Sequence, residues 1–226
     1  MPTGQRKFAR EDGKYADFLD TNSGKLQPGG TAFIGSSNLA APSDHVHPLA
    51  SGASTLIASQ VLAAPAANIT FSGIPQTFSV LRLLAVGASV YSIEGDRWTV
   101  QVSGDTSSNY DLQNIAGNNA SPTAGVKNAA PFWYIPNSTI GDIPGATATA
   151  GVAGILEVII PNYAGTTFQK VGKWYSGYSD AATAGADQIA VSATVAWRST
   201  AAITSLKVAA GDGNLAAGTA AYLYVS

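Results

Sequence analysis

Short apolar runs, separated by turn-forming residues, recur along the chain from residue 68 to its last residue. None of these runs has the three- and four-residue spacing of an amphipathic helix. Short apolar segments bounded by Gly, Pro, Asn and Ser are typical of strands in an antiparallel sandwich. The pattern predicts an all-β fold, a jelly-roll-like β-sandwich, with strands in residues 69–71, 78–90, 97–103, 154–160, 168–178, 188–197, 203–209 and 220–225.

Alternation of apolar and polar positions is clearest in residues 188–197. Successive side chains of a strand point to opposite faces of a sheet, so this segment places two sets of residues on two faces. The apolar set is predicted to face the core: Ile189, Val191, Ala193, Val195 and Trp197. The small or polar set is predicted to face away from it: Ala190, Ser192, Thr194 and Ala196. The same alternation occurs at Trp98, Val100 and Val102.

Two segments depart from this rhythm. Residues 55–62 are strand-like, although a short helix also fits their composition. Residues 113–153 contain several prolines and an aromatic cluster at residues 132–135. We interpret residues 113–153 as a long irregular insertion, and loops of this length are frequently functional.

The N-terminal part differs from the rest in charge. Residues 1–25 are the most densely charged part of the chain, and four apolar residues interrupt the charges: Phe8, Tyr15, Phe18 and Leu19. This spacing fits a short helical face as well as an irregular arm, and too little is apolar for the segment to fold alone. It is either an arm that orders on a partner or a frayed terminus. A Gly/Pro/Ser-rich linker follows at residues 24–43.

These patterns predict two domains, an extended attachment arm and neck in residues 1–52 and a β-sandwich head in residues 53–226. Of the 226 residues, 46% are hydrophobic and only 12% are charged. A soluble domain usually has roughly 25% charged residues, and a surface with few charges favours association with neighbouring copies.

Charge and composition also exclude several classes of function. The net charge of −2 gives no basic footprint for nucleic acid. No apolar run approaches the length of a membrane span, and residues 1–25 lack the apolar region of a signal peptide, so we expect synthesis in the cytoplasm and no membrane insertion. The absence of cysteine excludes disulfides and thiolate metal sites.

The two histidines of the chain, His45 and His47, lie in a Pro/Ser/Asp-rich segment and are candidate metal ligands. In an extended segment both rings share one face, and Pro48 favours an extended conformation in the residue before it. One chain supplies too few nitrogens for a complete site. Three copies around a threefold axis would supply six imidazoles, enough for an octahedral transition metal such as iron. The alternative is a pair of solvated loop side chains.

Other candidate sites have structural alternatives. Asp105 and Asn109 could bind a cation, or Asp105 could simply form a turn. Several aromatic residues could stack on sugar rings or belong to the core or a subunit interface: Trp133, Tyr134, Trp174, Tyr175 and Tyr178. Glu94, Asp96 and Glu157 are the carboxylates considered for a glycosidase pair, which needs two carboxyls across a cleft. With both histidines in a linker, a Ser-His-Asp triad has no support, and we expect no enzymatic activity.

Asp44-His45-Val46-His47-Pro48 resembles a signature of bacteriophage tail and fibre proteins, in which a short histidine pair lies in a trimeric collar. In some such trimers the histidine pairs enclose an iron ion on the axis. The resemblance implies a homotrimer and, for His45 and His47 alone, one iron ion per trimer.

A second resemblance covers residues 68–226, which are similar to a module at the ends of phage tail, fibre and baseplate proteins. Its matching segments lie at residues 69–78, 104–110, 197–206 and 218–226. The chain departs from the module at its end, Leu223-Tyr224-Val225-Ser226, where Leu-Tyr-Gly-Ile is usual.

The resulting hypothesis is a bacteriophage virion structural protein, exposed on the particle. The first choice is a tail fibre or tail-tip component, a homotrimer that attaches to other virion proteins through residues 1–25 and whose head binds the host surface, for example a cell-surface glycan. The alternatives are a capsid decoration protein or head fibre, and a carbohydrate-binding module.

Overall fold

The computed structural model describes residues 7–9, 15–17, 54–136, 141–180 and 188–226. The chain divides into two compact units, Met1–Ala53 and Ser54–Ser226, and each is described by itself. In the first unit, β1 (Lys7–Ala9) and β2 (Tyr15–Asp17) form an antiparallel pair, with Phe8 opposite Ala16. The helical interpretation of the arm is therefore wrong for these two segments. Within the described ranges, no helix is long and apolar enough to cross a membrane.

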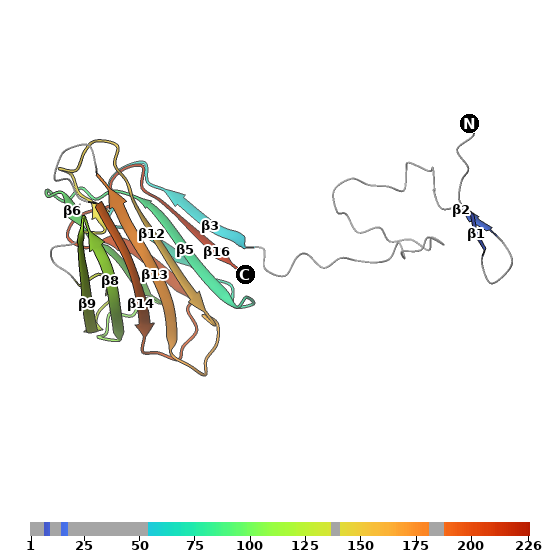
Figure 1. Cartoon of the computed structure of the whole chain (residues 1–226). Helices are drawn as coiled ribbons and strands as arrows, with labels where there is room; N and C mark the ends of the chain where they lie inside the picture. Colours follow the sequence, from blue (N-terminus) through green and yellow to red (C-terminus); the bar gives the residue numbers. More distant parts are fainter. Residues whose placement is uncertain (1–6, 10–14, 18–53, 137–140, 181–187) are drawn as a thin grey trace, which may run out of the picture. The chain divides into compact units, whose positions relative to one another are not determined.

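The second unit is a β-sandwich (Figure 1). Its large sheet has eight antiparallel strands in the order β3-β16-β5-β12-β13-β14-β8-β9. These strands are β3 (Thr55–Val61), β5 (Val80–Gly87), β8 (Tyr110–Asn118), β9 (Ser121–Ala130), β12 (Gly154–Pro161), β13 (Lys170–Ser179), β14 (Gln188–Trp197) and β16 (Ala220–Val225). A four-stranded sheet has the order β10-β7-β15-β4, with β4 (Asn68–Ser72), β7 (Trp98–Val102), β10 (Trp133–Tyr134) and β15 (Ser205–Ala210). A short pair joins β6 (Gly95–Asp96) to β11 (Ile143–Pro144).

The strand pairing is nested in the manner of a jelly roll. The hairpin of β12 and β13 is innermost in the chain, and around it β8 pairs with β14, β7 with β15, and β5 with β16. The chain thus folds back on itself as one long hairpin that is divided between two sheets. The predicted all-β, jelly-roll-like sandwich is confirmed.

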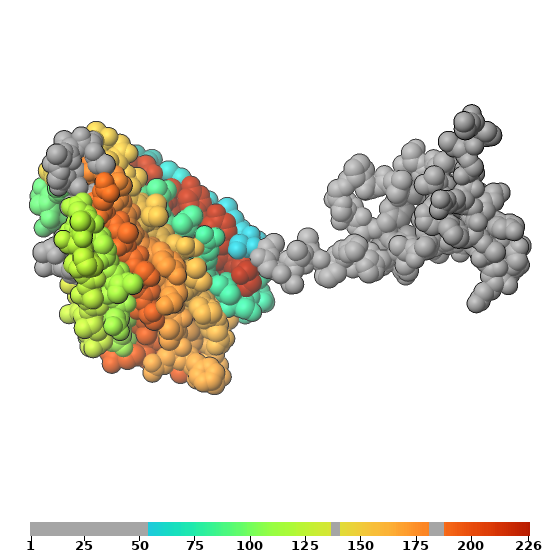
Figure 2. All heavy atoms as spheres, in the orientation of Figure 1, coloured from blue at the N-terminus to red at the C-terminus, as the bar shows by residue number. Residues whose placement is uncertain are grey.

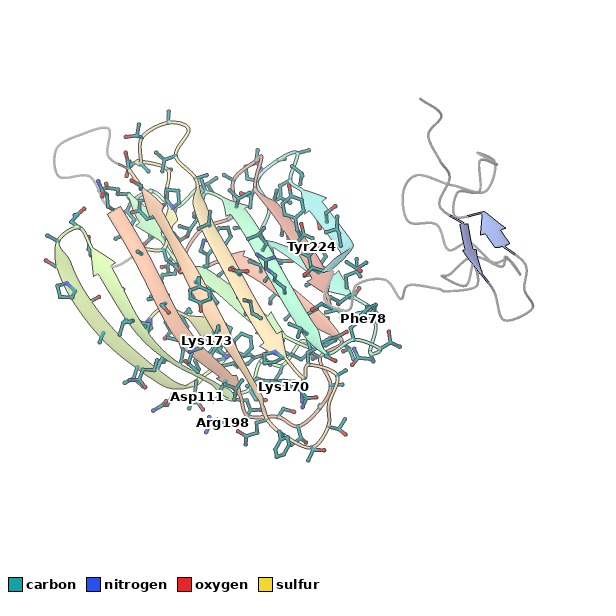
Figure 3. All side chains as sticks on the ribbon, turned by 45° about the vertical axis from the view of Figure 1, so that its right-hand side comes forward. Phe78, Asp111, Lys170, Lys173, Arg198 and Tyr224 are labelled. Atoms are coloured by element: carbon teal, nitrogen blue, oxygen red, sulfur yellow. The ribbon has the colours of Figure 1, made fainter. Side chains whose placement is uncertain are left out.

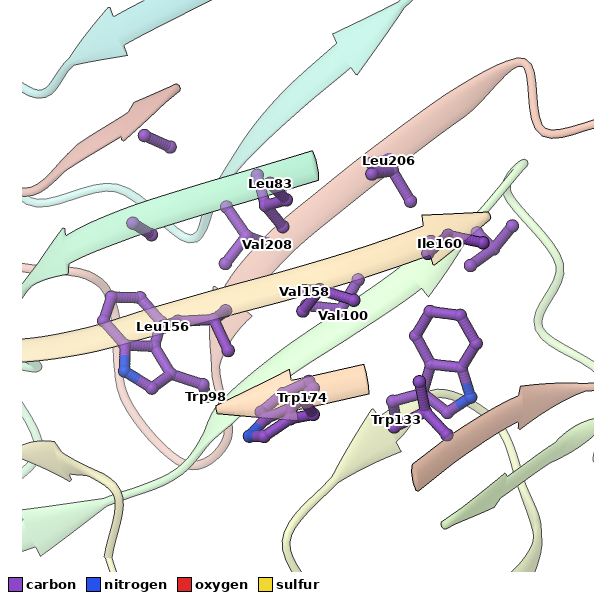
Figure 4. Close-up of a cluster of buried hydrophobic side chains, with 14 of the residues drawn as sticks. Leu83, Trp98, Val100, Trp133, Leu156, Val158, Ile160, Trp174, Leu206 and Val208 are labelled. Atoms are coloured by element: carbon purple, nitrogen blue, oxygen red, sulfur yellow. The ribbon is translucent and has the colours of Figure 1, made fainter. Parts of the chain in front are cut away.

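The core lies between the two sheets, where three fully buried tryptophans pack against aliphatic side chains from both (Figure 4). Trp174 comes from the large sheet, while Trp98 and Trp133 come from the small one. Trp133 is fixed by two contacts, because its Nε1 donates to Ala196 O at 2.8 Å and Tyr110 meets it edge to face at 5.6 Å. Burial of an aliphatic or aromatic side chain of this kind stabilises a fold by about 1.5–3 kcal/mol.

The alternation predicted for residues 188–197 is confirmed. The five apolar residues of the core-facing set are between 0% and 6% exposed, and β14 buries every second residue. All the runs predicted as strands contain one. Residues 55–61 form β3, so the strand interpretation of that segment is confirmed and the helical alternative is wrong.

The interpretation of residues 113–153 as an irregular insertion is wrong over much of its length. Strands β8 and β9 form a hairpin that extends the large sheet, and its pairing shifts register between Tyr110 and Leu112. Glycines and polar residues obscure the apolar rhythm in both strands, and Pro122 is tolerated because β9 is an edge strand. Within the aromatic cluster, Trp133 and Tyr134 form β10, and Trp133 and Ile135 are buried in the core.

Candidate interaction surface

The side of the eight-stranded sheet that faces away from the four-stranded sheet forms a broad surface, which we name the outer face (Figure 2). Alternate residues of the large-sheet strands point to it, while the residues between them enter the core. Large apolar side chains on it are more than a third exposed: Val86, Ile115, Val126, Ile155, Val171 and Tyr175. One face of a solvated antiparallel sheet is normally polar, so this distribution needs a partner to explain it.

Charged side chains on the outer face are held by neighbours in the same sheet. Arg82 on β5 forms an ion pair with Glu157 on β12 and lies 5.9 Å over the ring of Tyr224. Lys173 Nζ donates to Thr194 Oγ1 at 2.9 Å on the next strand (Figure 3). Asp111 Oδ2 lies 3.3 Å from Arg198 Nε. The two ion pairs are compensated within the sheet, whereas Lys173 is hydrogen-bonded to a neutral hydroxyl, so covering this face leaves few charges uncompensated.

A groove of about 780 Å³ runs over β8, β9 and β14 on the outer face. Small or apolar residues line most of it, namely Ile115, Gly117, Pro122, Ala124, Ala190 and Ser192. Two further hollows of about 240 and 220 Å³ lie along the same strands. Small side chains leave the backbone close to the surface, so this part of the sheet can receive apolar side chains of a partner.

The sequence does not reveal this groove, because β8 and β9 fall in the segment predicted as an insertion. The signal that identifies β8 is the alternation of Tyr110, Leu112 and Ala116, all of which are buried. Asn114 interrupts the apolar series, since it occupies a core-facing position between them and is only 2% exposed.

The predicted metal ligands His45 and His47 lie outside the described residues. Within the part of the chain that the structure describes, no three His, Cys, Asp or Glu side chains gather as a metal site requires. Asp105 accepts hydrogen bonds from Ser107 N at 2.8 Å, Asn109 Nδ2 at 3.0 Å and Trp197 Nε1 at 2.7 Å. Burial alone would raise the pKa of Asp105, but these hydrogen bonds lower it to about 2. The geometry supports the turn-forming interpretation of Asp105.

The candidate sugar-stacking aromatics divide into two groups. Trp133, Trp174 and Tyr178 are at most 6% exposed and belong to the core, so they cannot stack on a ligand. Tyr175 is 40% exposed on the outer face. Tyr134 is partly buried and lies beneath the Arg97 guanidinium, whose Cζ is 5.6 Å from the ring centre.

Two of the carboxylates considered for a glycosidase pair, Asp96 and Glu157, do not face one cleft. Asp96 is 2% exposed and accepts hydrogen bonds from one hydroxyl and three backbone amides. Glu157 lies on the outer face beside Arg82. A buried carboxylate saturated with donors and a surface carboxylate paired with arginine do not form the pair that such chemistry requires.

Asp142 is a fully buried carboxyl group in the core. Its Oδ1 accepts from Trp98 N at 2.8 Å and its Oδ2 accepts from Ser176 Oγ at 2.5 Å. Ser176 Oγ in turn accepts from Trp174 Nε1 at 2.8 Å, so the network joins the small sheet to the large one. Burial raises the pKa of Asp142 to about 7, and the hydrogen bonds only partly oppose it.

Asp142 makes stability depend on pH. Its pKa in the folded protein, about 7, lies above the ordinary value of 3.8, so the folded state retains a proton that the unfolded chain loses. The stability that the folded protein gains from protonated Asp142 is fully present below the pKa of this group in the unfolded chain. It is lost as pH rises through the pKa of this group in the folded protein. We expect Asp142→Asn, which stays neutral, to gain thermal stability relative to the original chain as pH rises from about 5 to about 9.

Thermal melting of both proteins over this range measures the effect, and the difference between them removes the contribution of every other titrating group. A difference in melting temperature that stays constant with pH would contradict the role of Asp142.

Comparisons with known proteins give little beyond this geometry. No protein-family model matches the sequence, and no curated protein matches it. A solved structure of a protein of unknown function from Shewanella oneidensis MR-1 matches with 10% identity and a TM-score of 0.21. The match covers 78% of this chain and 77% of that chain.

Proposed function

We propose that the protein is a structural component of a bacteriophage virion, a tail fibre or tail-tip protein that works as a homotrimer. The observation that carries the proposal is the outer face, a broad surface on which six large apolar side chains are more than a third exposed, in a chain with only 12% charged residues. A head with such a face gains free energy by burying it against copies of itself. The likeness of residues 44–48 and 68–226 to phage tail modules supports the same proposal.

Under this proposal, each part of the chain has its own role in the virion. Residues 1–25 attach the protein to other virion proteins, residues 26–52 form the neck, and the β-sandwich projects from the particle. No enzymatic step is part of the proposal. The charged arm suits attachment, because it contains aromatic anchors but too few apolar residues to fold without a partner.

Substitution on the outer face tests the trimer. We expect the full chain to have three times the 23.0 kDa mass of one chain in multi-angle light scattering. Ile115→Asp should weaken the trimer by at least about tenfold, because it buries an unpaired carboxylate in the interface.

Ile93→Asp is the matched control, since Ile93 is 52% exposed but lies outside the large-sheet strands. It should leave the trimer intact. A stable monomer of the original chain at micromolar concentration contradicts the proposal.

Removal of residues 1–25 tests the attachment arm and the virion assignment together. We expect the shortened protein to fold, because the sandwich has its own core. It should be missing from purified particles, because the segment proposed to attach it has been removed. Electron microscopy of particles that carry the labelled full chain then gives its position. Label on the tail supports the first choice, label on the capsid supports a decoration protein or head fibre, and loading of the shortened protein at the full level contradicts the arm.

In the proposed trimer, His45 and His47 of each chain are ligands of one iron ion on the threefold axis. Elemental analysis of the purified trimer should find one transition-metal ion per three chains. Metal content should fall as pH drops through about 6.5, the reference pKa of histidine, because only neutral imidazole coordinates a metal. A trimer without metal, unchanged in stability by His45→Ala with His47→Ala, would identify the pair as solvated loop residues.

A further inference from the structure

A pocket of about 230 Å³ lies at the end of the four-stranded sheet, away from the outer face. It is lined by Arg97, Thr99, Pro131, Phe132, Tyr134, Gly211 and Asp212. Its walls therefore come from β7, from β10 and the residues before it, and from the turn that follows β15. This pocket combines charged and aromatic side chains, whereas the groove on the outer face is lined by small and apolar ones.

The polar side of the pocket is an exposed ion pair. Arg97 Nη2 lies 2.5 Å from Asp212 Oδ2, and the two side chains are 28% and 42% exposed. Together they present hydrogen-bond donors and acceptors side by side at one position. A hydroxyl group can donate to the carboxylate while a neighbouring hydroxyl accepts from the guanidinium.

The apolar side of the pocket is aromatic. The rings of Phe132 and Tyr134 lie 5.5 Å apart at an angle of 57°, and Arg97 Cζ lies 5.6 Å from the centre of the Tyr134 ring. Pro131 continues this wall. The pocket therefore places aromatic carbon next to a paired donor and acceptor, and Phe132 and Pro131 are the parts of the apolar wall that the arginine does not cover.

Asp96 holds the polar side in place from below. Its Oδ1 accepts from Arg97 N at 2.7 Å and from Asp212 N at 3.0 Å, and its Oδ2 accepts from Gly213 N at 3.1 Å. Asp96 is itself only 2% exposed and also accepts from Ser89 Oγ at 2.6 Å. One buried carboxylate thus fixes the backbones of both members of the ion pair, so the pocket is preorganised.

We propose that this pocket binds one neutral sugar residue of a glycan. Hydroxyl groups match the Arg97–Asp212 pair, and the C–H face of a sugar ring matches the aromatic wall. An anion is disfavoured by Asp212 and a cation by Arg97, while an apolar ligand would remove water from the ion pair without replacing the hydrogen bonds that water makes to it. The inference rests on the proposed function, since it names the ligand class of the head on the host surface.

Glycan binding by the full-length protein tests the pocket. The probe is an array of immobilised neutral and anionic polysaccharides, followed by calorimetric titration with whichever oligosaccharide binds. The original chain should bind at least one neutral glycan, and Asp212→Ala should weaken that binding by at least about tenfold. Because Arg97 then has no carboxylate partner, the variant should also shift toward anionic glycans.

Phe168→Ala is the matched control, because Phe168 is an exposed aromatic residue that lies outside the large-sheet strands and does not line the pocket. It should leave glycan affinity unchanged. Phe132→Ala is a second variant that removes the aromatic wall and leaves the ion pair in place; it too should weaken binding. Thermal melting of every variant establishes that it is folded.

Three results would overturn the inference: no binding of the original chain to any neutral glycan, a preference of the original chain for anionic glycans, or affinity of the folded Asp212→Ala variant within about twofold of the original. Incorporation of the same proteins into particles is measured separately. A protein that loads onto virions but binds no neutral glycan refutes the pocket alone. A protein that binds the glycan through Asp212 but is missing from virions refutes the proposed function alone.

Discussion

An antiparallel sheet has two faces, and only one face of the eight-stranded sheet is covered by the four-stranded sheet. The covered face holds the core, in which Trp98, Trp133 and Trp174 pack between the sheets. The other face is open within the second unit, and alternation obliges half the residues of each strand to point to it. The polarity of those residues therefore determines whether the head is stable as a monomer or gains stability by association. The large exposed apolar side chains among them, together with the ion pairs that form within the sheet, favour association.

Buried carboxylates accept hydrogen bonds near the ends of the strands and hold neighbouring segments together there. Asp142 connects a backbone amide of the small sheet to a hydroxyl of the large sheet. Asp96 accepts hydrogen bonds from a backbone amide just before β7 and from two backbone amides in the turn after β15. Lys170 performs a similar task at another turn, since its Nζ donates to three backbone carbonyls at 2.6–3.1 Å. Asp96 and Lys170 thus satisfy backbone groups of turns, while Asp142 ties the two sheets together.

The sequence predicts the strands whose apolar residues are large and β-branched, as in residues 188–197, because burial of every second residue leaves a readable pattern. It does not predict β8 and β9, in which Asn114 and its cross-strand partner Gly125 stand where larger apolar residues would mark the alternation. Nor does it predict the pocket. Tyr134 is a sugar-stacking candidate from the sequence, but Arg97 and Asp212 are distant in the chain and look like ordinary surface residues until β7 pairs with both β10 and β15. When strand pairing brings distant residues together, their spacing in the sequence does not show that they form one site.

The two candidate surfaces belong to different sheets, and this separation matters for the proposed trimer. The groove and the exposed apolar residues lie on the large sheet, whereas the Arg97–Asp212 pocket is built on the small one. Burying the outer face between copies therefore leaves the pocket open to solvent. A single small polar pocket binds one sugar weakly, but three pockets on one particle component raise the effective affinity for a surface covered with repeated glycan units. In this arrangement assembly through one sheet makes weak recognition through the other sufficient for attachment.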